Sequence, residues 1–416
     1  MKVRSIVAFT CVALLAVTAA NARGTNWIET WAAAPQPPMP AMGPIAGAPS
    51  FSDQTIRQIV RISAGGDQVR VRLSNEYGAQ PLAIGAAHIA IAMGTAVQPG
   101  SDHVLTFGGS PTALIPPGAP LLSDPVALRV APLSSLSISL YLPGATGPCT
   151  CHAAGMATAY VSAAGNFAGQ VFTPDHTLQS RAFLSGVDVA AAAPAKTIVV
   201  LGDSISDGIG STVDTNHRWP DLLADRLDDG AAHDHEAWGI ANLGISGNRL
   251  LADGAGTGAL ARFDRDVLAA PGAAYVVVFE GINDIGLSYG HFTGPLAAAF
   301  SRMAPRNKVT AQQLIGAYQQ LIARAHLHGL KVIGVTLTPY QGSGYYAEQG
   351  EAVREAVNRW IRTGGAFDGV LDFDRVLRDP ADPKQIAAGL QAGDHLHGSD
   401  AGYAALVKSI DLSLFR

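Results

Sequence analysis

The spacing of apolar residues changes near residue 190, and this change limits the folds that the chain can adopt. Between Trp27 and Val189 apolar and polar residues alternate, as they do over residues 69–73 and 135–142. Such alternation is typical of antiparallel strands that bury one face. Turn signals such as the Pro-Pro-Gly sequence at 116–118 separate these stretches, and no amphipathic helix pattern comes between them. We therefore predict a half-buried all-β sandwich of the jelly-roll kind for this part of the chain.

The second half of the chain alternates short apolar runs with helical patterns. The runs suit parallel strands that are covered on both faces. They lie at residues 197–201, 275–279, 331–337 and 370–373. One intervening helix is expected to begin after Thr310, which forms a capping-box pair with Gln313, and to stop at Gly329. This order predicts a doubly wound α/β domain, in which ligands bind at the carboxyl ends of the strands.

An alanine-rich stretch at 189–195, which contains Pro194, separates the two patterns. Domains typically hold roughly 100 to 200 residues, so a chain of 416 residues is expected to form about two. We therefore expect a β-sandwich domain at residues 24–190 and an α/β domain at residues 196–416.

The first residues have the features of a secretory signal peptide. Lys2 and Arg4 precede an apolar stretch at 6–17, and Ala20-Asn21-Ala22 is a small-residue cleavage site. The apolar stretch is shorter than the roughly 20 residues that a membrane-spanning helix needs. The sequence therefore predicts a signal peptide at residues 1–22, a secreted or periplasmic protein, and no stable membrane insertion.

Charge and cysteine content exclude several classes of function. The formal net charge is −5 and only 15% of residues are charged, which gives no basis for nucleic-acid binding. Of the three cysteines, Cys11 lies in the signal peptide, so Cys149 and Cys151 are left to bridge or to remain free thiols. His152 beside them allows a metal site, but no second group of ligands stands at a suitable spacing. No metal is therefore predicted.

The clearest candidate nucleophile follows the first apolar run of the α/β half. The sequence Gly202-Asp203-Ser204 places a serine at a strand-to-helix turn, where its hydroxyl can face the crevice of the sheet. Taken alone, this segment favours Ser204 as the cap of the following helix over Ser204 as a nucleophile. The pattern also differs from the Gly-x-Ser-x-Gly elbow of α/β-hydrolases.

A serine hydroxyl needs a base, and the base must be oriented by an acceptor. Asp394 and His397 lie in a loop before a helix that is expected to begin near Ser399, and a carboxylate three residues before an imidazole can fold back onto it. His395 competes with His397, but it has less room for this contact. A lone Asp-x-x-His is also common among solvated loop residues.

Hydrolysis of an ester further needs donors for the negative oxygen that forms in the reaction. Three candidates follow strands: the N–H of Ser204, Gly247 and the side chain of Asn283, although glycine and asparagine are also ordinary turn residues. An aromatic, glycine-rich segment at 340–346 follows another strand and is interpreted either as a substrate loop or as an ordinary surface loop.

Four of these blocks together resemble the SGNH hydrolases, also called GDSL esterases and lipases. Gly202-Asp203-Ser204, Gly247, Gly281-x-Asn283-Asp284 and Asp394-x-x-His397 stand in the order of that family, over about residues 196–416. The resemblance implies a flavodoxin-like parallel sheet and no metal or organic cofactor. It also implies Ser204 as nucleophile, His397 as base and acid, Asp394 as its orienting partner, and Ser204, Gly247 and Asn283 as the oxyanion hole. Asp203 supports the loop in this family.

The resemblance and the signal peptide together predict a secreted carboxyl-ester hydrolase that forms an acyl-serine intermediate. Short acyl groups, acetyl groups on carbohydrates among them, are the expected substrates, and the oligomeric state is left open. The β-rich half resembles the sandwich that precedes the catalytic domain in some secreted bacterial members. Two alternatives are an O-acetyltransferase that uses the same serine and a non-catalytic carbohydrate-binding protein.

Overall fold

The computed structural model describes residues 26–40, 47–191, 194–229, 236–294 and 297–416. The predicted signal peptide at 1–22, with its cleavage site at Ala22, lies outside the described residues. Within the described ranges, no helix has both the length and the hydropathy needed to cross a bilayer.

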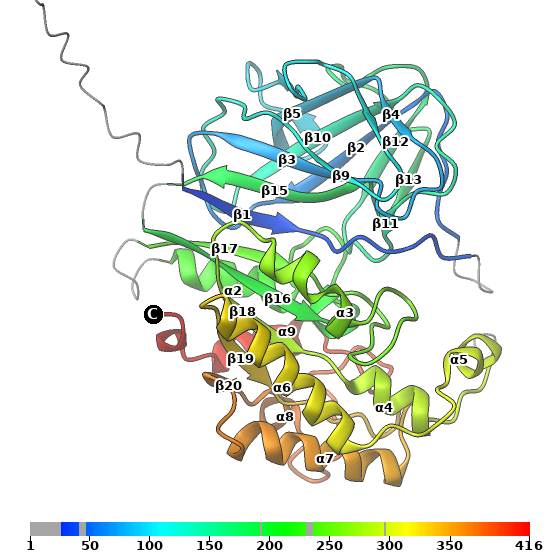
Figure 1. Ribbon diagram of the computed structural model, residues 1–416, viewed down its shortest axis with the longest axis vertical. Helices are drawn as coiled ribbons and strands as arrows, with labels where there is room; N and C mark the ends of the chain where they lie inside the picture. Colours follow the sequence, from blue (N-terminus) through cyan, green and yellow to red (C-terminus); the bar gives the residue numbers. More distant parts are fainter. Residues whose placement is uncertain (1–25, 41–46, 192–193, 230–235, 295–296) are drawn as a thin grey trace, which may run out of the picture.

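The first half of the chain forms two antiparallel sheets packed face to face, as predicted (Figure 1). One sheet has the order β1-β15-β3-β9, with bounds Trp27–Ala32, Leu184–Ala190, Val69–Ser74 and Pro120–Leu122. The other has the order β13-β12-β2-β10-β5-β6, with bounds His176–Leu178, Ala159–Ala164, Gln54–Arg61, Ser135–Leu142, Ala86–Met93 and Ala96–Val97; β7 (His103–Val104) also pairs with β5. Two short two-stranded antiparallel sheets pair β4 (Leu82–Ile84) with β8 (Ala113–Ile115) and β11 (Cys151–His152) with β14 (Arg181–Ala182).

One strand of the sandwich is more deeply buried than its alternating sequence predicts. In β10 the apolar side chains face the core, but Ser137 and Ser139 on the opposite face are also buried. The reason is that a loop covers this face. Arg57 donates from Nε to the Ser139 hydroxyl and from Nη2 to the carbonyl oxygens of Ala168 and Gln170, so the loop is held over the strand. The prediction that β10 is half-buried was therefore wrong.

The second half forms a parallel sheet with strand order β17-β16-β18-β19-β20. Their bounds are Ala237–Asn242, Ala195–Gly202, Ala273–Phe279, Lys331–Val335 and Gly369–Leu371. In chain order this is 2-1-3-4-5, the flavodoxin-like arrangement, and the predicted fold class is confirmed. The order reverses between β16 and β18, which is where such sheets bind ligands.

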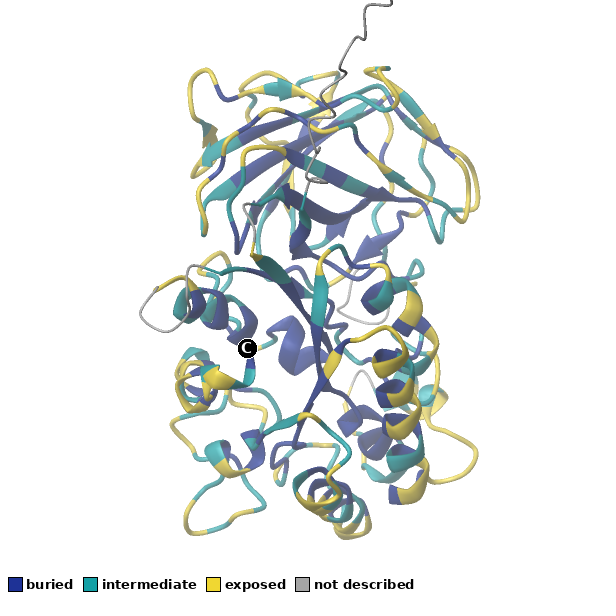
Figure 2. Ribbon diagram, turned by 60° about the vertical axis from the view of Figure 1, so that its left-hand side comes forward, coloured by how far each residue is buried: buried dark blue, intermediate teal, exposed yellow. Residues whose placement is uncertain are grey.

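Helices cover both faces of this sheet (Figure 1). On one face lie α3, α4, α6 and α7, with bounds Ala259–Phe263, Ile282–Tyr289, Ala311–Leu327 and Glu348–Thr363. On the other lie α2, α8 and α9, with bounds Trp219–Asp228, Phe373–Leu377 and Asp400–Ser409. The remaining elements are α1 (Ser204–Asp207), a π-helical turn (Asp264–Leu268), α5 (Ala297–Met303) and a 3₁₀ turn (Leu412–Leu414). Figure 2 shows exposed residues on the outward sides of the helices and buried residues along the strands.

Helix α6 begins and ends where its sequence predicts. The Thr310 hydroxyl accepts a hydrogen bond from the N–H of Gln313, and the Gln313 side chain accepts one from the N–H of Thr310. The helix ends at Leu327, and Gly329 follows with a φ of +74°, a conformation that favours glycine. The apolar stripe Leu314, Tyr318, Leu321, Ile322 and Ala325 is buried.

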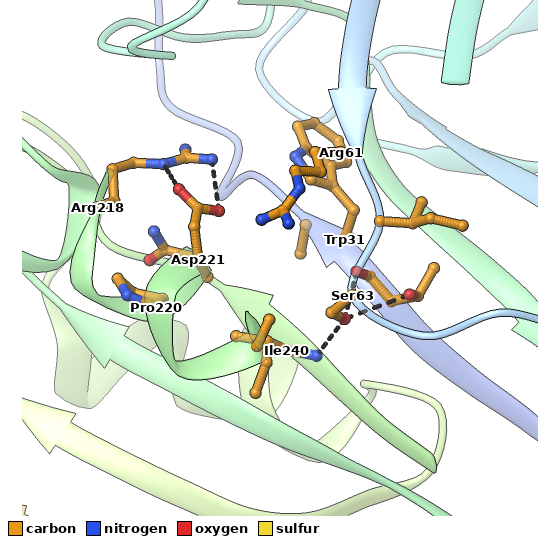
Figure 3. A pocket seen from close by; sticks show the side chains of 12 residues that line it. Trp31, Arg61, Ser63, Arg218, Pro220, Asp221 and Ile240 are labelled. Carbon is orange, nitrogen blue, oxygen red and sulfur yellow. Dashed lines mark hydrogen bonds and ion pairs between the residues drawn. The ribbon is translucent and has the colours of Figure 1, made fainter. Parts of the chain in front are cut away.

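The sandwich packs against the first strands of the parallel sheet. Figure 3 shows this junction, with Arg61 and Ser63 of the sandwich facing Asp221 and Ile240. The N–H of Ile240 donates to the Ser63 hydroxyl at 2.7 Å, and Arg61 forms an ion pair with Asp225. The cavity at this junction holds about 20 Å³, room for one water molecule. This cavity is therefore too small to enclose a ligand larger than water.

Candidate active site

The candidate nucleophile lies where β16 turns into α1. Asp203 occupies the N-cap of α1, and its Oδ1 accepts a hydrogen bond from the N–H of Ile205 at 2.9 Å. Because Asp203 caps the helix, the interpretation of Ser204 as a mere cap is wrong. The Ser204 hydroxyl is instead within 2.7 Å of His397 Nε2.

Three side chains form a continuous hydrogen-bonded series. His397 Nδ1 lies 2.5 Å from Asp394 Oδ2, while Asp394 Oδ1 accepts from the N–H groups of Leu396 and His397 at 2.9 Å. The carboxylate can only accept, so Nδ1 carries a proton and Nε2 of the neutral ring is free to accept the Ser204 proton. The loop is placed by α9, which Ser399 caps as predicted.

The electrostatics of this loop keep Asp394 ionised. Partial burial opposes ionisation, but the hydrogen bonds from the His397 side chain and from the backbone of His397 and Leu396 hold the pKa of Asp394 well below its usual value. His395, the competing imidazole, packs elsewhere: a Cβ built on Gly342 would lie 2.8 Å from its ring. Asp394 is therefore available to orient His397.

The three candidate oxyanion donors follow three adjacent strands, because β17, β16 and β18 lead to Gly247, Ser204 and Asn283 respectively. Among the described residues, neither the N–H of Ser204 nor that of Gly247 donates to an acceptor. The amide nitrogen of Asn283 is buried and also has no partner there. Three unpaired donors therefore lie at the carboxyl ends of adjacent strands, next to the switch point of the sheet.

The orientation of Asn283 is set by a residue of the aromatic loop. The Tyr345 hydroxyl donates to Asn283 Oδ1 at 3.0 Å, which leaves the amide nitrogen unpaired. Burial, with a smaller contribution from the nearby Asp203 charge, raises the pKa of Tyr345 well above its usual value, so the phenol stays a donor. The segment at 340–346 thus holds a candidate site residue in place, a role that its composition did not indicate.

A buried arginine joins the strand ends beneath the site. Arg262 donates to the carbonyl oxygens of Gly202 and Leu243 and pairs with Asp266 and Glu280. Asp284 makes a second link, because its carboxylate accepts from the N–H groups of residues 250 and 251 at 2.7 and 3.0 Å. These contacts hold the turns after β16, β17 and β18 in one arrangement.

The cysteines and the histidine at residues 149–152, which were considered as metal ligands, contact other groups of the protein. Within the described ranges, no three or more His, Cys, Asp and Glu side chains are arranged to hold a metal ion. Cys149 and Cys151 form a disulfide, and both ring nitrogens of His152 face protein oxygens, Asp207 Oδ1 at 2.8 Å and the Ala34 carbonyl at 3.2 Å.

The family model of GDSL-like lipases and acylhydrolases matches residues 198–410, just over half of the chain. The chain belongs to this family. The predicted resemblance is thereby confirmed, and this GDSL-like protein is an ester-hydrolysing enzyme. A search of curated proteins found no match.

Solved structures similar to this GDSL-like hydrolase include several enzymes of bacteria. A GDSL-like lipase from Bacteroides thetaiotaomicron is 18% identical, covering 54% of this chain and 92% of its own, with a TM-score of 0.38. A lipase/acylhydrolase from Enterococcus faecalis is 17% identical, covering 51% and 94%, with a TM-score of 0.36. A carbohydrate acetylesterase family member from Sinorhizobium meliloti is 15% identical, covering 51% and 94%, with a TM-score of 0.37.

Asp203 makes the stability of this GDSL-like hydrolase depend on pH. Burial raises the pKa of its carboxyl from 3.8 to about 7. Below pH 4 the carboxyl is protonated whether the chain is folded or not, and as the pH rises the unfolded chain ionises first. The free energy of unfolding is therefore highest while the buried Asp203 carboxyl is protonated in both states. It decreases as the pH rises from about 4 to about 7.

We expect Asp203→Asn to give a flatter pH dependence of the urea-unfolding midpoint over pH 4 to 8, because asparagine can still cap α1 but does not ionise. Asp411→Asn is the control, since Asp411 also accepts from a backbone N–H but is exposed. Equal slopes for wild type and Asp203→Asn would contradict this account.

Proposed function

We propose that this GDSL-like hydrolase is a secreted serine carboxyl-ester hydrolase that cleaves short-chain acyl esters, with acetyl groups on carbohydrates among its substrates. One observation carries the proposal. Ser204, His397 and Asp394 form a series with contacts of 2.7 and 2.5 Å, next to strand ends that carry three unpaired donors. This arrangement has each group that acyl transfer from an ester to water requires.

In the proposed mechanism His397 Nε2 takes the proton of Ser204 as Oγ attacks the ester carbonyl. The negative oxygen is stabilised by the N–H groups of Ser204 and Gly247 and by the amide of Asn283. His397 then gives the proton to the leaving alcohol, and an acyl-serine remains. Water attacks this ester with His397 again as base, which releases the acid and restores Ser204. Asp394 holds Nδ1–H throughout, and no cofactor takes part.

Exposure of the histidine loop supports short acyl groups and a bulky alcohol. The Asp394 side chain is 48% exposed, so the loop that carries the histidine lies at the protein surface. An open site of this kind leaves space for a saccharide outside it. We also propose that the signal peptide at 1–22 directs secretion, and that the chain divides into a sandwich domain at 24–190 and a catalytic domain at 196–416.

The test is turnover of p-nitrophenyl acetate, butyrate and palmitate and of an acetylated xylo-oligosaccharide. We expect Ser204 alone to react with a fluorophosphonate, and kcat/KM to be at least tenfold higher for acetate and butyrate than for palmitate.

Product analysis with an added acceptor sugar separates hydrolysis from O-acetyl transfer. Preference for palmitate, or acetylated sugar as the main product, would contradict the proposal. The non-catalytic alternative is not retained, because the family is one of ester-hydrolysing enzymes.

A further inference from the structure

The sandwich places a histidine against the helix that carries Ser204. His152 lies in the short strand β11, on the side of the sandwich that faces the parallel sheet (Figure 1). The side chain is buried, and its Nε2 lies 2.8 Å from Asp207 Oδ1 while its Nδ1 lies 3.2 Å from the Ala34 carbonyl. A carboxylate oxygen and a carbonyl oxygen can both accept, so each ring nitrogen of His152 faces an acceptor.

Asp207 connects this histidine to the loop that carries Gly247. It is the last residue of α1, three positions after Ser204, and it is buried. While Oδ1 faces His152, Oδ2 accepts from the backbone N–H of Ser246 at 2.9 Å and from its hydroxyl at 2.6 Å. One carboxylate therefore holds the nucleophile helix, the Gly247 loop and the sandwich together.

A second contact from the sandwich supports the other side of the same loop. The Gln36 side chain donates to the Ala255 carbonyl at 2.8 Å, and a Cβ built on Gly247 would lie 3.1 Å from the Cβ of Ala255. Gln36 also fixes the neighbourhood of His152, since its N–H donates to the Cys151 carbonyl and its Oε1 accepts from Ala153. The disulfide between Cys149 and Cys151 restrains this segment further.

We propose that His152 is a positioning residue of the ester-hydrolysing site, through which the sandwich holds the N–H groups of Ser204 and Gly247 in place. The inference rests on the proposed function, because it assigns those two groups to the oxyanion hole. Such donors accelerate a reaction only when they are already aligned, and a displacement of about 1 Å can cost 100-fold in rate. In this proposal the sandwich contributes to catalysis by keeping these two donors aligned.

Two amide substitutions separate the two hydrogen bonds of His152. In His152→Gln the side-chain nitrogen can reach the position of Nε2 and still donate to Asp207. In His152→Asn the nitrogen takes the position of Nδ1 and can donate only to Ala34. We expect kcat for p-nitrophenyl acetate to fall at least about tenfold in His152→Asn with KM within threefold, and to stay within threefold of wild type in His152→Gln.

Rates are expressed per Ser204 labelled by the fluorophosphonate, so that a misfolded fraction does not lower the measured kcat. A histidine that only stabilises the fold would lower the melting temperature of both variants and leave kcat per labelled site unchanged in both, which would overturn the inference. Equal losses of kcat in the two variants would also overturn it. Wild-type protein without Ser204-dependent turnover would instead contradict the proposed function.

Discussion

We expect Ser204→Ala to lower kcat for p-nitrophenyl acetate by roughly 10⁴-fold or more, with little change in KM or in stability. The hydroxyl is the only part of Ser204 that this change removes, and the backbone N–H remains in the candidate oxyanion hole. Steady-state kinetics with enzyme concentrated enough to measure the residual rate checks this result. The same change should abolish fluorophosphonate labelling.

Ser206→Ala is the matched control, because Ser206 belongs to the same helix and its hydroxyl is buried without a hydrogen-bond partner in the described part of the chain. It should keep kcat within a few fold. His397→Ala should cost about as much as Ser204→Ala, and the double variant no more than either one, since the two residues act in one proton transfer. Additive losses, or normal turnover in Ser204→Ala, would exclude the proposed nucleophile.

Removal of the Asn283 amide is expected to lower kcat by about 10²- to 10³-fold, which is the usual cost of one lost oxyanion donor. The substitution to test is Asn283→Ala, with KM expected to change little because the donor matters mainly when negative charge develops. Tyr345→Phe should give a smaller loss, since the amide stays but its Oδ1 loses the donor that orients it. Both are measured per labelled Ser204.

Asn358→Ala provides the control for a buried amide. The Asn358 side chain bonds the backbone of Leu337, away from the proposed donors, so its loss should lower the unfolding midpoint and leave kcat within threefold. Asn283→Ala could behave like this control, with a lower unfolding midpoint and an unchanged kcat per labelled Ser204. Asn283 would then not be an oxyanion donor.

The fold class could be predicted because its signals are local. Helix α6 shows this most plainly: Thr310 and Gln313 cap each other within one turn, and Gly329 ends the helix without any help from the rest of the protein. The strand runs of the parallel sheet were recognisable for the same reason. Burial of the serine face of β10 could not be predicted in this way, because it depends on Arg57, which lies 82 residues before Ser139, and on a loop 111 residues after Arg57.

The candidate site was predictable to the extent that its residues stand in short motifs. Asp394 and His397 are three residues apart, and Asp203 precedes Ser204, so their types and spacing indicate the chemistry. The residues that hold the motifs in place carry no such signal. Tyr345 lies in a segment that fits two interpretations, and no motif singles out Arg262 or Asp207.

The sequence alone determined the order of the elements, the two fold classes and the residue types available for acyl transfer, because periodicity and motifs depend on neighbours a few positions apart. Only the tertiary structure decided which groups meet. Ser204 and His397 are separated by 193 residues, Asn283 and Tyr345 by 62, and His152 and Asp207 by 55. Hydrogen bonds over such separations form only when packed sheets and loops bring the atoms within about 3 Å, and no local pattern encodes that approach.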